Sequence, residues 1–135
     1  MVKHQLIEVK TNGQGLYEIT DQVIDFCKGT PSGILNIFIK HTSASLIIQE
    51  NADPTARQDL QTFLNKLVPE NQDWHQHIFE GPDDTTSHLK SAITNTQISI
   101  PIYEGQLGLG TWQGIYVWEH RSNMHSRKLI LSIIQ

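Results

Sequence analysis

The segment Ile34-Leu35-Asn36-Ile37-Phe38-Ile39-Lys40 is the most informative part of this 135-residue chain for the fold class. Large apolar β-formers dominate it and occupy both of its alternating faces. A strand that is apolar on both faces is typical of the centre of a sheet with cover on both sides. We therefore expect a sheet whose central strand spans residues 34–40, with the other elements arranged around it.

Further strands are expected before and after this segment. Residues 2–11 alternate between apolar and polar side chains, and Asn12-Gly13-Gln14-Gly15 then predicts a hairpin that returns along residues 16–19. Later strands are expected over residues 97–103, 111–119 and 128–134. Pro101 lies in the first of these, which predicts a position near a sheet edge.

Three short helices are predicted between the strands. Thr20 is expected to cap the first, which Gly29 ends. Asp53-Pro54 is a strong start for the second. Its apolar stripe comprises Leu60, Phe63, Leu64 and Leu67. Asp83 or Asp84 is expected to cap a third helix that runs through Leu89 and Ile93.

The absence of a βαβ rhythm favours an α+β protein with a mostly antiparallel sheet or sandwich and two or three short helices. No linker or repeat interrupts the chain, so residues 1–135 are predicted to form one domain. The hydrophobic share of 38% is low for a self-contained monomer. This share favours a core that a partner subunit helps to complete.

Charge and composition narrow the class of function. The net charge is −4 and the Lys and Arg residues form no basic block, which argues against a nucleic-acid partner. No window approaches the roughly 20 apolar residues of a membrane span, and no signal peptide is recognised. Cys27 is the only cysteine, at an apolar helical position, and is expected to be a core thiol. We expect a soluble cytoplasmic protein with no membrane partner.

The segment Glu80–Lys90 is dense in groups that carry protons or bind metal ions. Its carboxylates Asp83 and Asp84 are candidates for holding Mg²⁺. His88 is the candidate for proton transfer, and Glu50, which follows the apolar run Leu46-Ile47-Ile48, is the alternative. The rest of the chain is expected to be a scaffold that brings other polar segments to this one.

Histidines offer a second way to hold a metal. His41, His88 and His120 each lie where an apolar element gives way to polar residues, and rigid elements that end in this way position sites. These three imidazoles are predicted ligands for a softer ion such as Zn²⁺. The alternative is three partly buried histidines with satisfied hydrogen bonds. The further pair His75-x-His77 lies in a polar loop with no expected strand and is not among the predicted ligands.

Phosphate-binding groups are predicted downstream. The backbone at Gly108 and Gly110, with Thr111, is able to form an anion nest, although a tight turn with close strand packing is the alternative. Trp112 is a candidate for stacking on a planar ring or for the core. Arg121 and Arg127 are predicted to bind phosphate or, alternatively, to form surface ion pairs.

Taken together, these segments resemble a known family over nearly the whole chain. The residues that carry the resemblance are His41-Thr42-Ser43-Ala44-Ser45, Glu50-Asn51, Asp53-Pro54, Arg57, Asp59, Glu80-Gly81, Asp83-Asp84, Ser87-His88, Lys90, Gly110-Thr111-Trp112-Gln113-Gly114-Ile115, Glu119-His120-Arg121 and Ser126-Arg127. This set is similar to the YjbQ-like family, also called the secondary thiamine-phosphate synthase family. The Gly-Thr-Trp-Gln segment is its most specific motif.

The resemblance implies a small α+β fold that assembles as a homotrimer, with sites near subunit contacts. It also implies a weak or side activity that joins hydroxymethylpyrimidine diphosphate to thiazole phosphate and releases pyrophosphate. A divalent metal, Mg²⁺ or Zn²⁺, is expected to neutralise charge on the leaving group. Two alternatives stay open, namely a metal-dependent hydrolase of a phosphorylated metabolite and a non-catalytic ligand-binding trimer.

Overall fold

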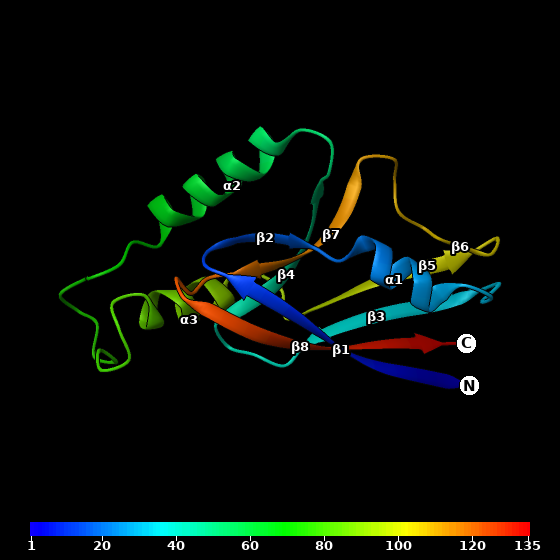
Figure 1. The fold of residues 1–135 in the computed structure, drawn as a ribbon, viewed down its shortest axis with the longest axis horizontal. Helices are drawn as coiled ribbons and strands as arrows, with labels where there is room; N and C mark the ends of the chain where they lie inside the picture. Colours follow the sequence, from blue (N-terminus) through cyan, green and yellow to red (C-terminus); the bar gives the residue numbers. More distant parts are fainter.

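Two antiparallel sheets form the body of the protein in a computed structural model that describes residues 1–135 (Figure 1). The larger sheet has the strand order β1-β8-β3-β5-β6, with β1 Val2–Asn12, β8 Met124–Ile134, β3 Gly33–Ile39, β5 Gln97–Tyr103 and β6 Gln106–Leu107. The smaller sheet has the order β2-β7-β4, with β2 Gly15–Glu18, β7 Gln113–Glu119 and β4 Ala44–Glu50. The predicted α+β class and mostly antiparallel pairing are confirmed.

The hydrophobic core lies between the two sheets. Leu35, Ile37 and Ile39 of β3 are fully buried in it, because alternate residues of a strand point to the same face. Helix α1 (Thr20–Cys27) adds Val23 and Phe26 to the same cluster. The core therefore joins both layers and the first helix into one unit.

Strand β3 is central in its sheet, as predicted, but the prediction that both of its faces are covered is wrong. Ile34 and Phe38 are 43% and 44% exposed on the outer face of the sheet. The strand covered on both faces is β7, where Trp118 donates a hydrogen bond to Gln61 of helix α2 at 2.9 Å. The helices α2 (Pro54–Leu67) and α3 (Asp84–Ala92) contact the smaller sheet, which leaves the larger sheet open on one side.

The predicted hairpin between residues 2–11 and 16–19 does not form. Strand β1 pairs with β8 along its whole length, from Val2 opposite Ile134 to Asn12 opposite Met124. Strand β2 pairs instead with β7 in the other sheet. An eleven-residue ladder outweighs the short ladder that β2 offers, so the glycine-rich segment carries the chain between sheets.

The helix starts follow the sequence signals only in part. Asp53 caps α2 by accepting a hydrogen bond from the Thr55 N–H at 2.9 Å, as predicted. Thr20 is the first residue of α1 rather than its cap, and its hydroxyl donates to Glu18. Asp83 occupies the cap position of α3 without a capping bond, because its carboxylate binds elsewhere.

On α2, Leu64 is buried, whereas Phe63 is 60% exposed.

A buried ion pair ties the two sheets together at one end. Glu119 of β7 accepts hydrogen bonds from the Arg127 guanidinium of β8, at 2.7 Å from Nε, and from the Thr11 hydroxyl of β1 at 2.6 Å. Burial alone would raise the pKa of the Glu119 carboxyl, but these hydrogen bonds and the arginine charge hold it below its ordinary value. The carboxylate is therefore ionised, and its charge is compensated inside the protein.

Replacing Arg127 with Leu is expected to lower the free energy of unfolding by about 3–5 kcal/mol, since Glu119 would stay buried without a counter-charge. Urea denaturation followed by circular dichroism, at one fixed protein concentration, measures this loss. The control is Lys128→Gln on the neighbouring exposed side chain, which should change stability by less than about 0.5 kcal/mol. A loss of under about 1 kcal/mol for Arg127→Leu would contradict a structural role for the pair.

Candidate functional site

Three side chains direct ligand atoms to one point at the edge of helix α3. His77 Nε2 lies 2.7 Å from Asp84 Oδ2, and His88 Nε2 lies 3.1 Å from the same oxygen. The ligand atoms of the three residues all lie within 4.8 Å of one another. We call this set the His77–Asp84–His88 cluster.

Local structure explains why these residues meet. Asp84 is the first residue of α3 and His88 follows four residues later, so both side chains lie on one face of the helix. His77 comes from the loop of residues 70–81, which precedes α3 and contains neither helix nor strand. The Thr85 hydroxyl donates a hydrogen bond to the His77 carbonyl, which anchors the loop to the first turn of the helix.

Arg121 orients the carboxylates of this segment. Its Nε donates to Asp83 Oδ2 at 2.9 Å and its Nη1 donates to Asp84 Oδ1 at 2.7 Å, while Nη2 donates to the Glu80 carbonyl. One oxygen of Asp84 is therefore paired with the guanidinium, and the other faces the two histidines. Arg121 organises the loop and both aspartates rather than presenting a free guanidinium to phosphate.

The charge state of Asp84 follows from these contacts. Burial alone would raise the pKa of its carboxyl. The hydrogen bond to His77 and the charges of His88 and Arg121 outweigh burial and hold the pKa below its ordinary value. Asp84 is thus an ionised carboxylate, which is the form that binds a metal ion.

The proton on His88 can be placed from its hydrogen bonds. Its Nδ1 lies 2.9 Å from the Thr42 carbonyl oxygen, and a carbonyl only accepts hydrogen bonds, so Nδ1 carries a proton. In the neutral ring, Nε2 then holds a lone pair that faces an ionised carboxylate oxygen. The Nε2 lone pair and Asp84 Oδ2 repel each other at 3.1 Å unless a cation lies between them. That cation is either a second proton on His88 or a metal ion.

The donor set fits a divalent metal ion. Two imidazole nitrogens and one carboxylate oxygen, with a solvent-facing side, match the three protein ligands and open position of catalytic zinc sites. The Thr42 carbonyl holds the outer nitrogen of His88 in the way that outer-shell acceptors orient metal-binding histidines. Because Mg²⁺ prefers oxygen ligands, this set favours a zinc-like ion over Mg²⁺.

The other two predicted metal ligands, His41 and His120, do not belong to the cluster. His41 Nε2 accepts a hydrogen bond from the Lys128 backbone N–H at 2.8 Å, which occupies its lone pair. His120 is fully buried, and its Nε2 lies 2.9 Å from the Ser45 hydroxyl. Burial, with the nearby Lys90 charge, lowers the pKa of His120 to about 3, so the ring is neutral. Of the three predicted histidines, only His88 has a metal-binding geometry.

Glu50 and the Gly108–Trp112 segment lie away from the cluster. Ala44 is opposite Glu119 at one end of the β4–β7 ladder and Glu50 is opposite Gln113 at the other, so about 20 Å of strand separates the two ends. The Glu50 carboxylate accepts the backbone N–H groups of Ala52 and Asp53 at 2.8 Å each and shapes the turn before α2. Glu50 therefore does not accompany His88 in proton transfer within one chain.

The glycines form no open anion nest. The Gly108 N–H donates to the Pro101 carbonyl, and a Cβ at this position would lie 2.9 Å from that oxygen, so close strand packing explains the glycine. The Gly110 N–H donates to the Gln113 side chain at 2.8 Å. Thr111 and Trp112 precede β7 rather than starting it, and Trp112 is 63% exposed rather than in the core. Arg127, the second predicted phosphate ligand, is buried against Glu119.

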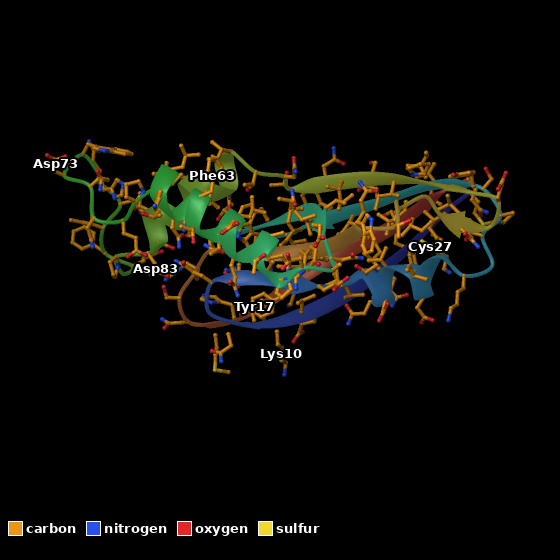
Figure 2. The ribbon with its side chains drawn as sticks, turned by 90° about the horizontal axis from the view of Figure 1, so that it is seen from above. Lys10, Tyr17, Cys27, Phe63, Asp73 and Asp83 are labelled. Carbon is orange, nitrogen blue, oxygen red and sulfur yellow. The ribbon has the colours of Figure 1, made fainter.

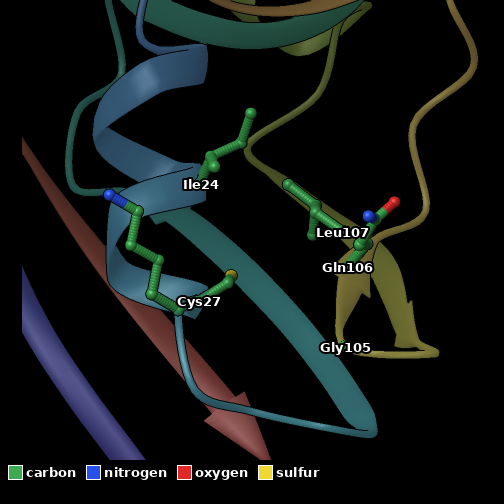
Figure 3. A pocket seen from close by; sticks show the side chains of 6 residues that line it. Ile24, Cys27, Gly105, Gln106 and Leu107 are labelled. Carbon is green, nitrogen blue, oxygen red and sulfur yellow. The ribbon is translucent and has the colours of Figure 1, made fainter.

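A hollow at the opposite end of the molecule carries no comparable chemistry. Ile24, Cys27, Gln106 and Leu107 line a space of about 280 Å³ between α1 and β6 (Figure 3). Figure 2 shows Cys27 at one end of the protein and Asp73 and Asp83 at the other. Burial raises the pKa of the Cys27 thiol, which agrees with a core thiol rather than a nucleophile.

His77 is the cluster residue that the sequence prediction missed. Its pair with His75 was visible as a His-x-His motif, but the surrounding loop offered no regular spacing to place it. The sequence signal that identifies the pair Asp84 and His88 is their four-residue separation on a helix. Pairing His77 with them requires the loop to fold back, which no periodicity shows.

The comparisons with known proteins agree with this fold. Residues 5–135 match the family described as UPF0047 protein YjbQ-like. A UPF0047 protein of Synechocystis is 44% identical over 134 residues, covering 97% of this chain and 91% of the relative. UPF0047 protein YjbQ of Salmonella typhimurium is 40% identical over 130 residues, covering 94% of each chain.

None of the helices in the structure combines the length and the apolar character that a membrane-spanning helix needs.

Solved structures show the same architecture. A conserved hypothetical protein of Thermus thermophilus has a TM-score of 0.87 at 32% identity, covering 96% of this chain and 99% of the other. An uncharacterised YjbQ/UPF0047 protein of Clostridium acetobutylicum has a TM-score of 0.83 at 33% identity, covering 95% and 99%. Sequence and fold therefore agree over nearly the whole chain, and the protein belongs to the UPF0047 protein YjbQ-like family.

Proposed function

We propose that this protein is a metal-dependent enzyme that acts on a phosphorylated small molecule. The observation that carries the proposal is the convergence of His77 Nε2 and His88 Nε2 on one oxygen of an ionised, buried Asp84. The reaction proposed from the family resemblance is the joining of hydroxymethylpyrimidine diphosphate to thiazole phosphate with release of pyrophosphate. The acidic net charge of −4 supports a small-molecule partner over nucleic acid.

The chain's own residues would hold and orient the reacting groups. His77, Asp84 and His88 supply the ligands, and an ion bound there would neutralise the negative charge that develops on a leaving phosphate or pyrophosphate. Arg121 fixes the Asp84 carboxylate through its second oxygen, so the ligand set is organised before substrate arrives. Glu80, whose carboxylate lies 3.6 Å from His77 Nε2 and faces solvent, is placed to accept a proton at the rim of the cluster.

Hydrolysis of a phosphorylated metabolite is the second candidate. Both arginines expected to hold phosphate are engaged by carboxylates, Arg121 by Asp83 and Asp84 and Arg127 by Glu119. A site with few unpaired cationic side chains suits a reaction in which a single phosphate group binds the metal ion and water attacks that phosphate group. The two candidates differ in whether one or two organic substrates are needed.

We also propose that the protein assembles as a homotrimer in the cytoplasm. The outer face of the larger sheet exposes large apolar side chains at Leu6, Ile34, Phe38 and Ile134. Leu6 and Phe38 both lie opposite Ile130, so the apolar groups form a row across three strands. A contiguous apolar face of this kind marks an interaction surface. The single buried cysteine supports a reducing compartment.

One zinc-like ion per chain is expected to bind, and His77→Ala and His88→Ala should each weaken binding by at least about tenfold. Isothermal titration of chelator-treated protein with Zn²⁺ and, separately, Mg²⁺ measures stoichiometry and affinity. Binding should also weaken as pH falls, because protons compete for the same imidazole nitrogens. His41→Ala is the matched control and should bind like the wild type. Equal losses in His41→Ala and His77→Ala would refute the cluster.

Activity is expected to depend on the same residues. Wild-type protein loaded with metal should form thiamine phosphate from the two precursors, and His88→Ala should reduce the rate by about 100-fold or more since it removes a metal ligand. His41→Ala, which lies outside the cluster, is the control. Phosphate released from a single ester, with no condensed product, would favour the hydrolase. Turnover equal in wild type and His88→Ala would point to a contaminating enzyme.

Light scattering is expected to give a mass of three times 15.3 kDa. Phe38→Asp should dissociate the assembly, because it places a charge in the centre of the apolar row. Phe63→Asp, on the exposed side of α2, changes an aromatic residue that is even more exposed but lies outside this row, and should keep the wild-type mass. A wild-type mass of one chain would overturn the trimer.

A further inference from the structure

A hollow at the end of strand β3 has the lining of an anion-binding site. Its volume is about 570 Å³, which is within the range of small-ligand sites. Lys40, Thr42 and Thr96 line it, and all three residues are exposed, so solvent reaches them. Phe38 of the apolar row forms one wall, and no Asp or Glu is among the lining residues. The hollow is therefore accessible, polar and free of negative charge.

The polar groups of this lining are not used within the chain. The hydroxyls of Thr42 and Thr96 have no hydrogen-bond partner, because these residues contribute only their backbone carbonyls to hydrogen bonds. The Lys40 ammonium group and the Thr42 N–H likewise donate to no acceptor of the protein. An ammonium group, a backbone N–H and two hydroxyls around one hollow are donors of the kind that bind an oxyanion.

A second lysine lies directly beside Lys40. The Lys40 N–H donates to the Lys128 carbonyl at 3.0 Å, which extends the β3–β8 ladder by one pair beyond Ile39 opposite Leu129. Paired residues of antiparallel strands share a face, and like charges directly opposite each other are destabilising. Neither lysine forms an ion pair, although Glu8 of β1 lies opposite Lys128 on its other side. One carboxylate beside two lysines leaves a positive charge that a bound anion would compensate.

We infer that this hollow binds an oxyanion, a phosphate group, between Lys40 and Lys128 and the hydroxyls of Thr42 and Thr96. Assigning that group to the substrate rests on the proposed function, which requires positive charge for a phosphorylated molecule. Both arginines expected to supply that charge are paired with carboxylates instead. The two lysines are free to supply it.

Thr42 joins this hollow to the His77–Asp84–His88 cluster. Its carbonyl accepts the hydrogen bond from His88 Nδ1 at 2.9 Å, while its exposed side chain lines the hollow. One residue therefore orients a proposed metal ligand and borders the oxyanion. A substrate with two phosphate groups would place one at the metal ion and the other at the lysines.

The site is tested first without metal, by titrating chelator-treated protein with inorganic phosphate and following backbone amide signals by NMR. The signals of Thr42 and Thr96 should shift to saturation, and higher salt should weaken binding. Lys40→Gln should weaken binding by at least about tenfold, because it removes a charged hydrogen-bond donor. Lys66→Gln is the matched control, since Lys66 is also exposed and outside any ion pair but lies on α2. Equal affinities in the two variants would overturn the site.

Thr42→Val removes a hydroxyl while keeping the shape of the side chain, and should weaken phosphate binding severalfold. Saturating shifts confined to other parts of the protein would overturn the site. An unchanged amide spectrum of Lys40→Gln outside residues 38–43 and 95–97 shows that the variant is folded.

The assignment to the substrate is tested separately. With metal-loaded protein and the phosphorylated substrate that it turns over, Lys40→Gln should raise KM by about tenfold and leave kcat nearly unchanged. Lost phosphate binding with an unchanged KM would overturn the substrate role. Phosphate binding that requires the metal would overturn the lysine site and leave the proposed function standing. Phosphate binding by a protein that takes up no zinc would overturn the proposed function and leave the oxyanion site standing.

Discussion

Pairing between arginines and carboxylates at the end of strand β7 holds the polar end of this protein in place. The last residue of the strand and a residue just beyond it bind different partners. Glu119 points into the sandwich and binds Arg127, while Arg121 binds Asp83 and Asp84 at the start of α3. The same short segment therefore locks the two sheets to each other and fixes the helix that carries the candidate site. Without these pairs, four buried charges would lack compensation.

The sequence could predict the fold only where local patterns determine the structure. The apolar pattern of residues 34–40 correctly placed a central strand, and Asp53-Pro54 correctly placed a helix start. Local patterns failed where the choice was between competing long-range partners. Asn12-Gly13-Gln14-Gly15 has the composition of a hairpin, yet β1 gains a longer ladder from β8 at the far end of the chain. Only the full set of strands decides that competition.

The site shows the same division between local and long-range information. Asp84 and His88 were both predicted as site residues from their chemistry, but for different metal sites, Asp84 with Asp83 and His88 with His41 and His120, and their pairing within one helix was not predicted. Arg121 and Arg127 were recognised as important charges, but the phosphate role assigned to them differs from their contacts, since sequence does not show which carboxylate an arginine meets. His77 was missed because a loop without periodicity carries it. The outer face of β3, in turn, has an apolar pattern that no segment of this chain covers.

The strand order also has a consequence for how the protein is made. Strand β8 is the last element of this chain, and it lies between β1 and β3, which are synthesised first. The two terminal residues are hydrogen-bonded to each other, with the Gln135 N–H donating to the Met1 carbonyl at 2.9 Å. Such contacts between residues distant in sequence are characteristic of slow folding topologies. On the ribosome, β1 therefore has no strand partner, and β3 has only β5, until residues 124–134 have emerged, so the larger sheet is completed only after translation of its final strand.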